Sequence, residues 1–466
     1  MASDMGKTIR LVGSGLLRKG LTLAVLPLYT RAMLPGAFGV VGYGMALLLM
    51  LGVVATLSLP SAASRFVIDT ETPRARRELL STLLVTVGVT AVVVSGCMVI
   101  GAWAIQPVGL DSGGNDMLAV VLGLAACLSG RAGSSTLASY SLARTLHDSV
   151  AAAETLEEVV KHTLMVSMAL MGHLTPVTYF WGTAMGIWSG VAFLAWVNRE
   201  DVRWTWSPTV LRAALVYSSP LILHSAAYNG VHYLDRLILA PTVGAEALGV
   251  YHLTYSLAFA PFTVVLLMVR AWSPLANLGF KEGNPSRYRA MSDAVAAGGG
   301  LTGLCVVITL PLVLSAFFPG AYRPPDELPA VLVLSELLYL LYTASVLPLT
   351  YHKRNGIIPV ITILALVTNA SLLVLLVPHY GLIGAGWATV AAFGVMGGGT
   401  LVAAHRLTSE SISVTALSIV GATVAAVLAF VYAPGPWKWI TGVAVAGWAA
   451  WTLANSIRAF TTRRLG

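Results

Sequence analysis

The sequence is dominated by long apolar stretches, each of about the length that crosses a lipid bilayer. An α-helix rises 1.5 Å per residue, so about 20 apolar residues span the hydrocarbon core. About fourteen such stretches follow one another between polar breaks. They lie at residues 8–30, 38–60, 79–105, 117–140, 156–173, 175–197, 209–233, 245–270, 293–318, 328–350, 357–377, 381–404, 411–433 and 437–458. The sequence therefore predicts an all-α, polytopic membrane protein.

Composition agrees with this fold class. The chain of 466 residues is 57% hydrophobic and 10% charged, whereas a soluble domain carries roughly 25% charged residues. The 28 Lys and Arg residues exceed the 20 acidic residues. In a membrane protein this excess indicates topology signals before it indicates a nucleic-acid partner, and we predict none.

Connections that are rich in basic residues alternate along the chain with connections that carry few. The positive-inside rule places the basic connections on the cytoplasmic side. The basic residues on the predicted cytoplasmic side are Arg74, Arg76, Arg77, Arg144, Lys161, Arg199, Arg203, Arg212, Lys281, Arg287, Arg289, Lys353, Arg354 and Arg406, with Lys7, Arg10, Arg458, Arg463 and Arg464 at the termini. The opposite side carries Arg31, Arg236, Arg323 and Lys438. We therefore expect both termini to be cytoplasmic.

An internal repeat divides the chain. "AFGVVGY" at 37–43 is similar to "ALGVYHL" at 247–253, and each opens the second helix of a six-helix group. Two glycines of the sixth stretch, Gly182 and Gly190, match Gly386 and Gly394 of the twelfth at a constant offset. Because six is even, the repeats run parallel. The predicted domains are a six-helix bundle at 1–204, a second at 205–406, and two extra helices with a cytoplasmic tail at 407–466.

Cations inside the apolar stretches are the strongest candidates for a site. A charge at the bilayer centre costs several kcal/mol, so a cavity or a partner must face it. Arg18 and Lys19 lie near the middle of the first stretch, about 100° apart around a helix, so we expect only one to face the cavity centre. The other candidates are Arg31, Arg65, Arg131, Arg236 and Arg270. The alternatives are snorkelling for Arg65 and Arg270 and a local pair of Arg236 with Asp235.

Few carboxylates are expected near these cations. Glu336 and Asp235 are the main anionic candidates in the deep part of the chain, so a cavity lined by the cations should stay net positive. Arginine suits phosphate because its planar fork makes two parallel hydrogen bonds. We therefore predict that a phosphate or pyrophosphate binds Arg18. The structural alternative is a pair between Arg18 and Glu336 or Asp235.

A polar stripe runs along the seventh stretch. Tyr217, His224, Tyr228 and Asp235 follow helical spacing, and Asn229 lies beside them. Hydroxyl, amide, imidazole and aromatic groups suit a sugar, and the alternative is hydrogen bonding between helices. The sequence shows no nucleotide-binding loop, catalytic acid pair or metal-ligand spacing. We therefore expect no enzyme activity, no cofactor and no metal.

At this point a family resemblance becomes visible. The segment 26–66, with Tyr29, Arg31, Pro35 and Gly39, resembles the start of bacterial oligosaccharide flippases of the Wzx type, in the MATE-like or MOP exporter superfamily. The segments "YLDRLILAPTVGAEALGVYHLTYSLA" at 233–258 and "PHYGLIGAGWAT" at 378–389 resemble the start of the second half and a later helix turn of these proteins.

The resemblance implies a V-shaped pair of six-helix bundles that works by alternating access in the bacterial inner membrane. In the related lipid II flippases, arginines on the first, second and eighth helices hold the pyrophosphate, and Arg18, Arg65 and Arg270 lie on those helices here. The two extra helices of those relatives form a lipid groove. The implied substrate is a polyprenyl-(pyro)phosphate-linked oligosaccharide, in contact with membrane lipids.

Other functions stay open from the sequence. A multidrug or metabolite antiporter of the same fold should show an acidic cavity, and a membrane glycosyltransferase or polymerase should carry a sizeable external loop with catalytic acids. A non-transporting scaffold of a polysaccharide assembly complex is a further alternative. A polysaccharide polymerase and glycosyltransferases are the expected protein partners.

Overall fold

The computed structural model describes residues 2–70, 72–105, 114–203, 205–408, 410–432 and 437–462, and every regular element in these ranges is helical. The helices form two compact units, Met1–Gly249 and Val250–Gly466. The predicted all-α fold is thus confirmed for the described part of the chain. The predicted terminal arginines Arg463 and Arg464 lie outside the described residues.

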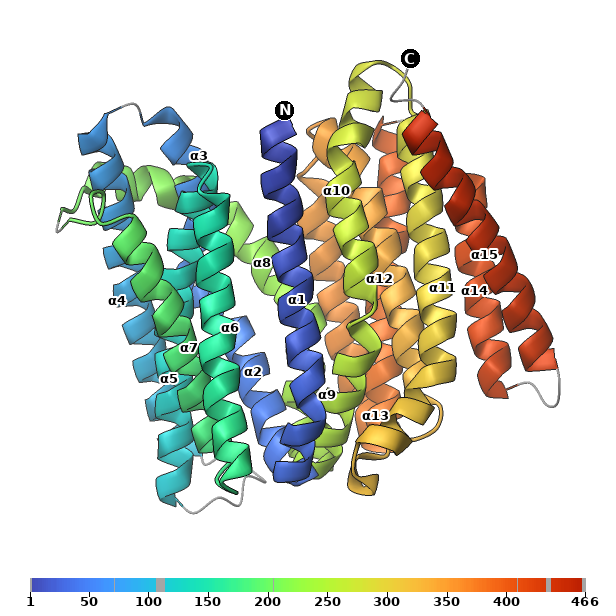
Figure 1. Cartoon of the computed structure of the whole chain (residues 1–466), viewed down its shortest axis with the longest axis horizontal. Coiled ribbons are helices and arrows are strands. Elements are labelled where there is room, and N and C mark those ends of the chain that lie inside the picture. Colours follow the sequence, from blue (N-terminus) through green and yellow to red (C-terminus); the bar gives the residue numbers. More distant parts are fainter. Residues whose placement is uncertain are drawn as a thin grey trace. The chain divides into compact units, whose positions relative to one another are not determined.

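The first unit contains the helices drawn from blue to green in Figure 1. They are α1 (Ala2–Ala32), α2 (Pro35–Thr56), α3 (Leu59–Phe66), η1 (Val67–Asp69), α4 (Pro73–Ile105), α5 (Gly114–Ala143), α6 (His147–Leu170), α7 (Pro176–Val197), α8 (Pro208–Val243) and the first turn of α9 (Ala245–Phe259). Within this unit α6 contacts α1, α5 and α7, and α8 contacts α2, α3 and α4. The division of the chain into repeats at 204/205 stays a prediction.

The second unit is built around α11 (Ser286–Phe317), which contacts four other helices of the unit. These are α10 (Phe262–Lys281), α12 (Leu328–Tyr351), α14 (Val414–Tyr432) and α15 (Trp437–Thr462), and the unit also contains η2 (Gly320–Tyr322) and α13 (Ile357–Thr408). In Figure 1 the red pair α14 and α15 lies against the yellow α11. The predicted break after residue 377 is confirmed, because the non-helical φ of 53° at Gly381 divides α13 into two helices.

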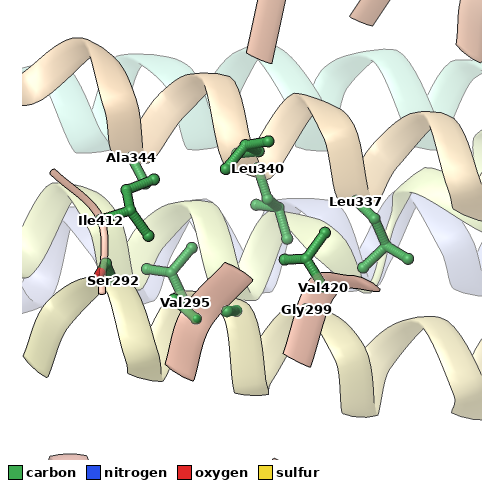
Figure 2. A pocket seen from close by; sticks show the side chains of 11 residues that line it. Ser292, Val295, Gly299, Leu337, Leu340, Ala344, Ile412 and Val420 are labelled. Atoms are coloured by element: carbon green, nitrogen blue, oxygen red, sulfur yellow. The ribbon is translucent and has the colours of Figure 1, made fainter. Parts of the chain in front are cut away.

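The contact between α11, α12 and α14 is close and apolar. Figure 2 shows the small void that remains there, lined among others by Val295, Leu337, Leu340 and Val420. Its volume of about 20 Å³ is close to the space that one water molecule needs. The Ser413 hydroxyl, just before α14, donates a hydrogen bond to Asp293 of α11. The C-terminal helix pair is therefore held to this unit by packing and by a polar contact.

The 15 α-helices of the described residues correspond to the fourteen predicted stretches after three adjustments. Among the described residues, 11 helices are long and apolar enough to cross a membrane, and α13 contains two of the predicted stretches. The second predicted stretch is broken into α2 and α3 at Leu57 and Ser58, which have φ of 49° and 52°. The eighth is broken into α9 and α10 before Pro261. Proline lacks the backbone N–H that would continue the hydrogen bonding of a helix, so α9 ends before Pro261.

Two helices extend well beyond their predicted ends. The predicted fifth stretch starts at 156, but α6 begins at His147, so Glu154 belongs to the helix together with Glu157 and Glu158. The predicted eighth stretch ends at 270 and the ninth starts at 293, but α10 continues to Lys281 and α11 starts at Ser286. A stretch that is chosen by hydropathy ends at the first charged residues. The helix itself continues past them when their side chains form ion pairs. Arg270 consequently lies in the middle of α10, not at a helix end.

Candidate functional site

Basic side chains of α1 and α5 meet the acidic side of α6. An Arg18 Nη of α1 lies 2.5 Å from a carboxylate oxygen of Glu154, and Arg18 Nε donates to the carbonyl of Ser14 at 3.2 Å. An Arg131 Nη of α5 lies 3.1 Å from a carboxylate oxygen of Glu157. Two arginines from different helices are thus paired with glutamates one turn apart on α6.

The contact between α6 and α7 lies beside these charged residues. Gly186 and Gly190 of α7 pack against the α6 backbone: a Cβ on Gly186 would lie 2.6 Å from the carbonyl oxygen of Glu157, and one on Gly190 3.2 Å from that of Ala153. Small residues at this spacing bring helices close together. These α7 glycines therefore let α6 and α7 pack closely beside Glu157.

More charged groups continue along α6. Glu158 forms an ion pair with Lys161, and one of its carboxylate oxygens lies 3.0 Å from Nε2 of His162. Lys19, the neighbour of Arg18 on α1, is exposed, and its charge adds to those of Arg18, Arg131 and Lys161. We call Arg18, Lys19, Arg131, Glu154, Glu157, Glu158 and Lys161 the α6 charge cluster. Its four cations and three carboxylates leave one positive charge when His162 is neutral.

Neutral hydrogen bonds fix α1 to α6 on the C-terminal side of the cluster along α1. The Tyr29 hydroxyl lies 2.7 Å from Nδ1 of His162, and the Thr22 hydroxyl lies 3.3 Å from Nε2. Tyr29 and His162 are 3% and 4% exposed, so this contact is part of the core. The C-terminal part of α1 is therefore held independently of the ion pair at Arg18.

A polar pocket of about 460 Å³ adjoins the cluster, between α2, α3, α5 and α8. Its lining includes Thr56, Ser61, Arg131, His224, Tyr228 and Asn229. The Asn229 amide donates to the carbonyl of Leu49 at 2.7 Å, and the buried Nδ1 of His224 has no hydrogen-bond partner among the described residues. Pockets of roughly 300–1,000 Å³ hold small-molecule groups. Arg131 belongs to both the cluster and this pocket, so the two form one continuous candidate site.

Not every predicted site residue joins this site. Arg65 pairs with Asp69 at 2.6 Å on an exposed helix end, and Tyr217 packs against Phe66. Asp235 and Arg236 form a buried ion pair at 2.9 Å, which is the local pairing given above as the alternative.

Two predicted arginines are exposed, Arg31 in the first unit and Arg270 in the second. Their part in binding stays a prediction.

Arg18 pairs with Glu154, and Asp235 pairs with Arg236, so the alternative pair of Arg18 with Asp235 is wrong. Glu336 is buried in α12 of the second unit. The sequence placed Glu154, Glu157 and Glu158 in or beside a cytoplasmic loop, so the expected shortage of acids near the cations was wrong too. Glu154, Glu157 or Glu158, and Lys161 or His162 follow one another at intervals of three or four residues, which is the sequence signal for one helix face.

Among the described residues, no group of three or more His, Cys, Asp or Glu side chains is arranged to hold a metal ion. The carboxylates of the cluster instead face arginine and lysine. The chemistry of the site is therefore ionic binding and hydrogen bonding.

Known proteins share both the sequence family and the fold. Residues 5–276, more than half of the chain, match the family "Polysaccharide biosynthesis protein". No curated protein matches this sequence. A solved structure of the lipid II flippase MurJ in an inward closed conformation is similar over 100% of both chains, with 10% identity and a TM-score of 0.69.

Multidrug transporters share the fold as well. An inward-facing MATE family transporter of the MOP superfamily is similar over 82% of this chain and 93% of its own, with 13% identity and a TM-score of 0.60. The Vibrio cholerae MATE transporter VcmN, solved as a point mutant, is similar over 90% and 100%, with 14% identity and a TM-score of 0.59. With the apolar helices, the family match identifies the chain as a multi-pass membrane protein that belongs to the polysaccharide biosynthesis protein family and shares its fold with these transporters.

Proposed function

We propose that the chain moves a polyprenyl-(pyro)phosphate-linked oligosaccharide from the cytoplasmic to the outer leaflet of a bacterial inner membrane. The observation that carries this proposal is the α6 charge cluster, where Arg18 and Arg131 approach one helix from two sides. Cations inside apolar helices are costly unless they bind something, and guanidinium groups bind phosphate through two parallel hydrogen bonds. The phosphate of the lipid carrier fits this chemistry.

The polar pocket supplies the second part of the substrate site. Its hydroxyl groups, the Asn229 amide and the Tyr228 ring suit a sugar, and Arg131 joins the pocket to the charge cluster. In this proposal the phosphate binds the arginines, a sugar occupies the pocket, and the polyprenyl chain stays in the bilayer. Two six-helix repeats alternate access to the site, both termini are cytoplasmic, and a polymerase and glycosyltransferases act on the same glycan.

Transport of a labelled lipid tests the proposal. The purified protein is placed in phosphatidylcholine vesicles with a fluorescent polyprenyl-pyrophosphate-linked sugar, and an impermeant quencher measures how much of the lipid has changed leaflets. We expect Arg18→Ala and Arg131→Ala to slow flipping at least tenfold. Arg74→Ala is the control, because Arg74 is 90% exposed and pairs with Glu78 on α4, away from the cluster. Equal rates for all three variants and the unaltered protein would overturn the proposal.

The three glutamates favour a second candidate, an antiporter for organic cations. Carboxylates inside the helices can bind a cationic drug, and two of the similar structures are MATE transporters. The same vesicles distinguish the two functions, because an antiporter would move ethidium under an ion gradient and leave the labelled lipid in place.

A further inference from the structure

We infer that Glu154 and Glu157 are built-in counter-ions, which occupy Arg18 and Arg131 between transport events and yield them to the substrate phosphate. This inference rests on the proposed function, because it assumes that the arginines bind phosphate. Each glutamate pairs with one arginine, at 2.5 Å for Glu154 and 3.1 Å for Glu157. A phosphate must therefore compete with a carboxylate that the protein itself provides.

The charge of the cluster shows why such counter-ions are useful. With Glu158 as the only carboxylate, its four cations would leave three positive charges; with Glu154 and Glu157 the excess is one. Uncompensated charge in a low-dielectric environment is strongly unfavourable. The glutamates lower this cost when no phosphate is present. They also compete with other anions for the arginines, so these anions bind less tightly.

Exposure shows that the Arg18–Glu154 pair can be exchanged. The side chains of Arg18 and Glu154 are 23% and 35% exposed, so a competing anion can reach them. The buried Asp235–Arg236 pair of the same unit is different, with side chains only 1% and 4% exposed. Arg236 also donates to the carbonyl of His232 at 2.8 Å and lies over the Tyr233 ring. That pair is part of the core, whereas Arg18 and Glu154 meet at an accessible edge.

The Arg131–Glu157 pair has an accessible side as well. The Arg131 side chain is 47% exposed and lines the polar pocket, while the Glu157 side chain is only 10% exposed. An anion can therefore approach the arginine from the pocket without displacing the helix that carries the glutamate.

Phosphate can replace Glu154 at Arg18 without separating α1 from α6. The hydrogen bonds from Tyr29 and Thr22 to His162 hold α1 at a separate place and involve no residue of the two exchanged pairs. Binding of phosphate would thus free Glu154 while the helices stay together.

Neutral variants of the glutamates test this inference. Glu154→Gln and Glu157→Gln keep the size of the side chain but remove the competing charge. The measurements use the full-length protein in lipid nanodiscs, calorimetric titration with inorganic pyrophosphate, and flipping of the labelled polyprenyl-pyrophosphate sugar. We expect Glu154→Gln to bind pyrophosphate roughly tenfold more tightly, equivalent to about 1.4 kcal/mol. Its apparent KM and its kcat should both fall, because release becomes slower.

Glu78→Gln is the matched control, since Glu78 pairs with Arg74 at the same 3.1 Å as the Arg131–Glu157 pair but at an exposed site of α4. It should leave binding and flipping unchanged. If Glu154→Gln bound pyrophosphate equally well or more weakly, or raised the KM, the ion pair would be structural and the inference would be wrong. The proposed function would still stand if the unaltered protein flipped the lipid, and it would fail if that protein neither bound pyrophosphate nor flipped.

A conservative variant keeps the test decisive if Glu154→Gln folds poorly. Glu154→Asp retains the charge but shortens the side chain, so the pair with Arg18 becomes longer and weaker. We expect a smaller increase in pyrophosphate affinity for this variant, and a loss of affinity would contradict the inference.

Discussion

Gly39 of α2 and Gly249 of α9 lie backbone against backbone, at positions that the internal repeat aligns. A Cβ on Gly39 would lie 1.9 Å from the carbonyl oxygen of Ala245, and a Cβ on Gly249 would lie 1.9 Å from that of Pro35. The contact is therefore reciprocal: each helix start places its glycine against the first turn of the other. Only a residue without a side chain permits this approach.

Gly39→Ala should consequently destabilise the protein. Its methyl group would overlap the Ala245 carbonyl, and overpacking of this kind costs typically about 1–3 kcal/mol. We expect a lower melting temperature in detergent, measured by size-exclusion chromatography after heating. Gly88→Ala on α4 is the control, because nothing lies within 4 Å of the added Cβ. Equal melting temperatures for both variants would contradict the close contact.

A second prediction concerns the glycines that set the position of α6. Gly186→Ala places a Cβ 2.6 Å from the Glu157 carbonyl, so α6 must shift and the Arg131–Glu157 pair should weaken. Gly182→Ala, one turn away on the same helix, meets its nearest atom at 3.6 Å and should be tolerated. We expect flipping to fall several-fold in the first variant alone. A similar loss in both would mean that α7 as a whole, and not this contact, is sensitive.

The third prediction separates charge from geometry at Arg18. Arg18→Ala should abolish flipping while the protein stays folded, because the Tyr29–His162 contact still holds α1. Arg18→Lys keeps the charge but loses the two-pronged hydrogen bonding, so it should retain partial activity. The readouts are the flipping rate and the melting temperature. Normal flipping by Arg18→Ala would place the phosphate elsewhere.

The fourth prediction concerns the polar pocket. His224→Ala removes a buried nitrogen that has no hydrogen-bond partner among the described residues, so the protein should be as stable as before or slightly more so. Flipping of a glycan-bearing lipid should nevertheless slow, while pyrophosphate binding stays unchanged. An unchanged flipping rate would remove His224 from the sugar site.

The last prediction concerns membrane topology. The helix α11 joins the connection that holds Asn284 to the one that holds Ala321, and both residues are exposed. In intact cells a cysteine at Ala321 should react with an impermeant maleimide, and one at Asn284 should react only after the cells are opened. The reverse pattern would invert the topology.

Much of the fold could be predicted because its causes are local. Transfer of an apolar stretch into lipid depends on that stretch alone, so the helices were found from hydropathy, and the break near Gly381 from the polar residues beside it. Helix ends were predicted poorly where charges occur, as in α6, since hydropathy cannot tell a paired charge inside a helix from a solvated one in a loop.

The sequence by itself determined that the chain is a multi-pass helical membrane protein with cations inside its helices, because the cost of exposing apolar surface or burying charge is a property of each segment. Only the tertiary structure decided which anion each cation meets. Arg18 pairs with Glu154 and not with Asp235, because the fold packs α6 against α1, whereas Asp235 meets Arg236. Ion pairing depends on distance in space, and the order of residues along the chain does not encode that distance directly.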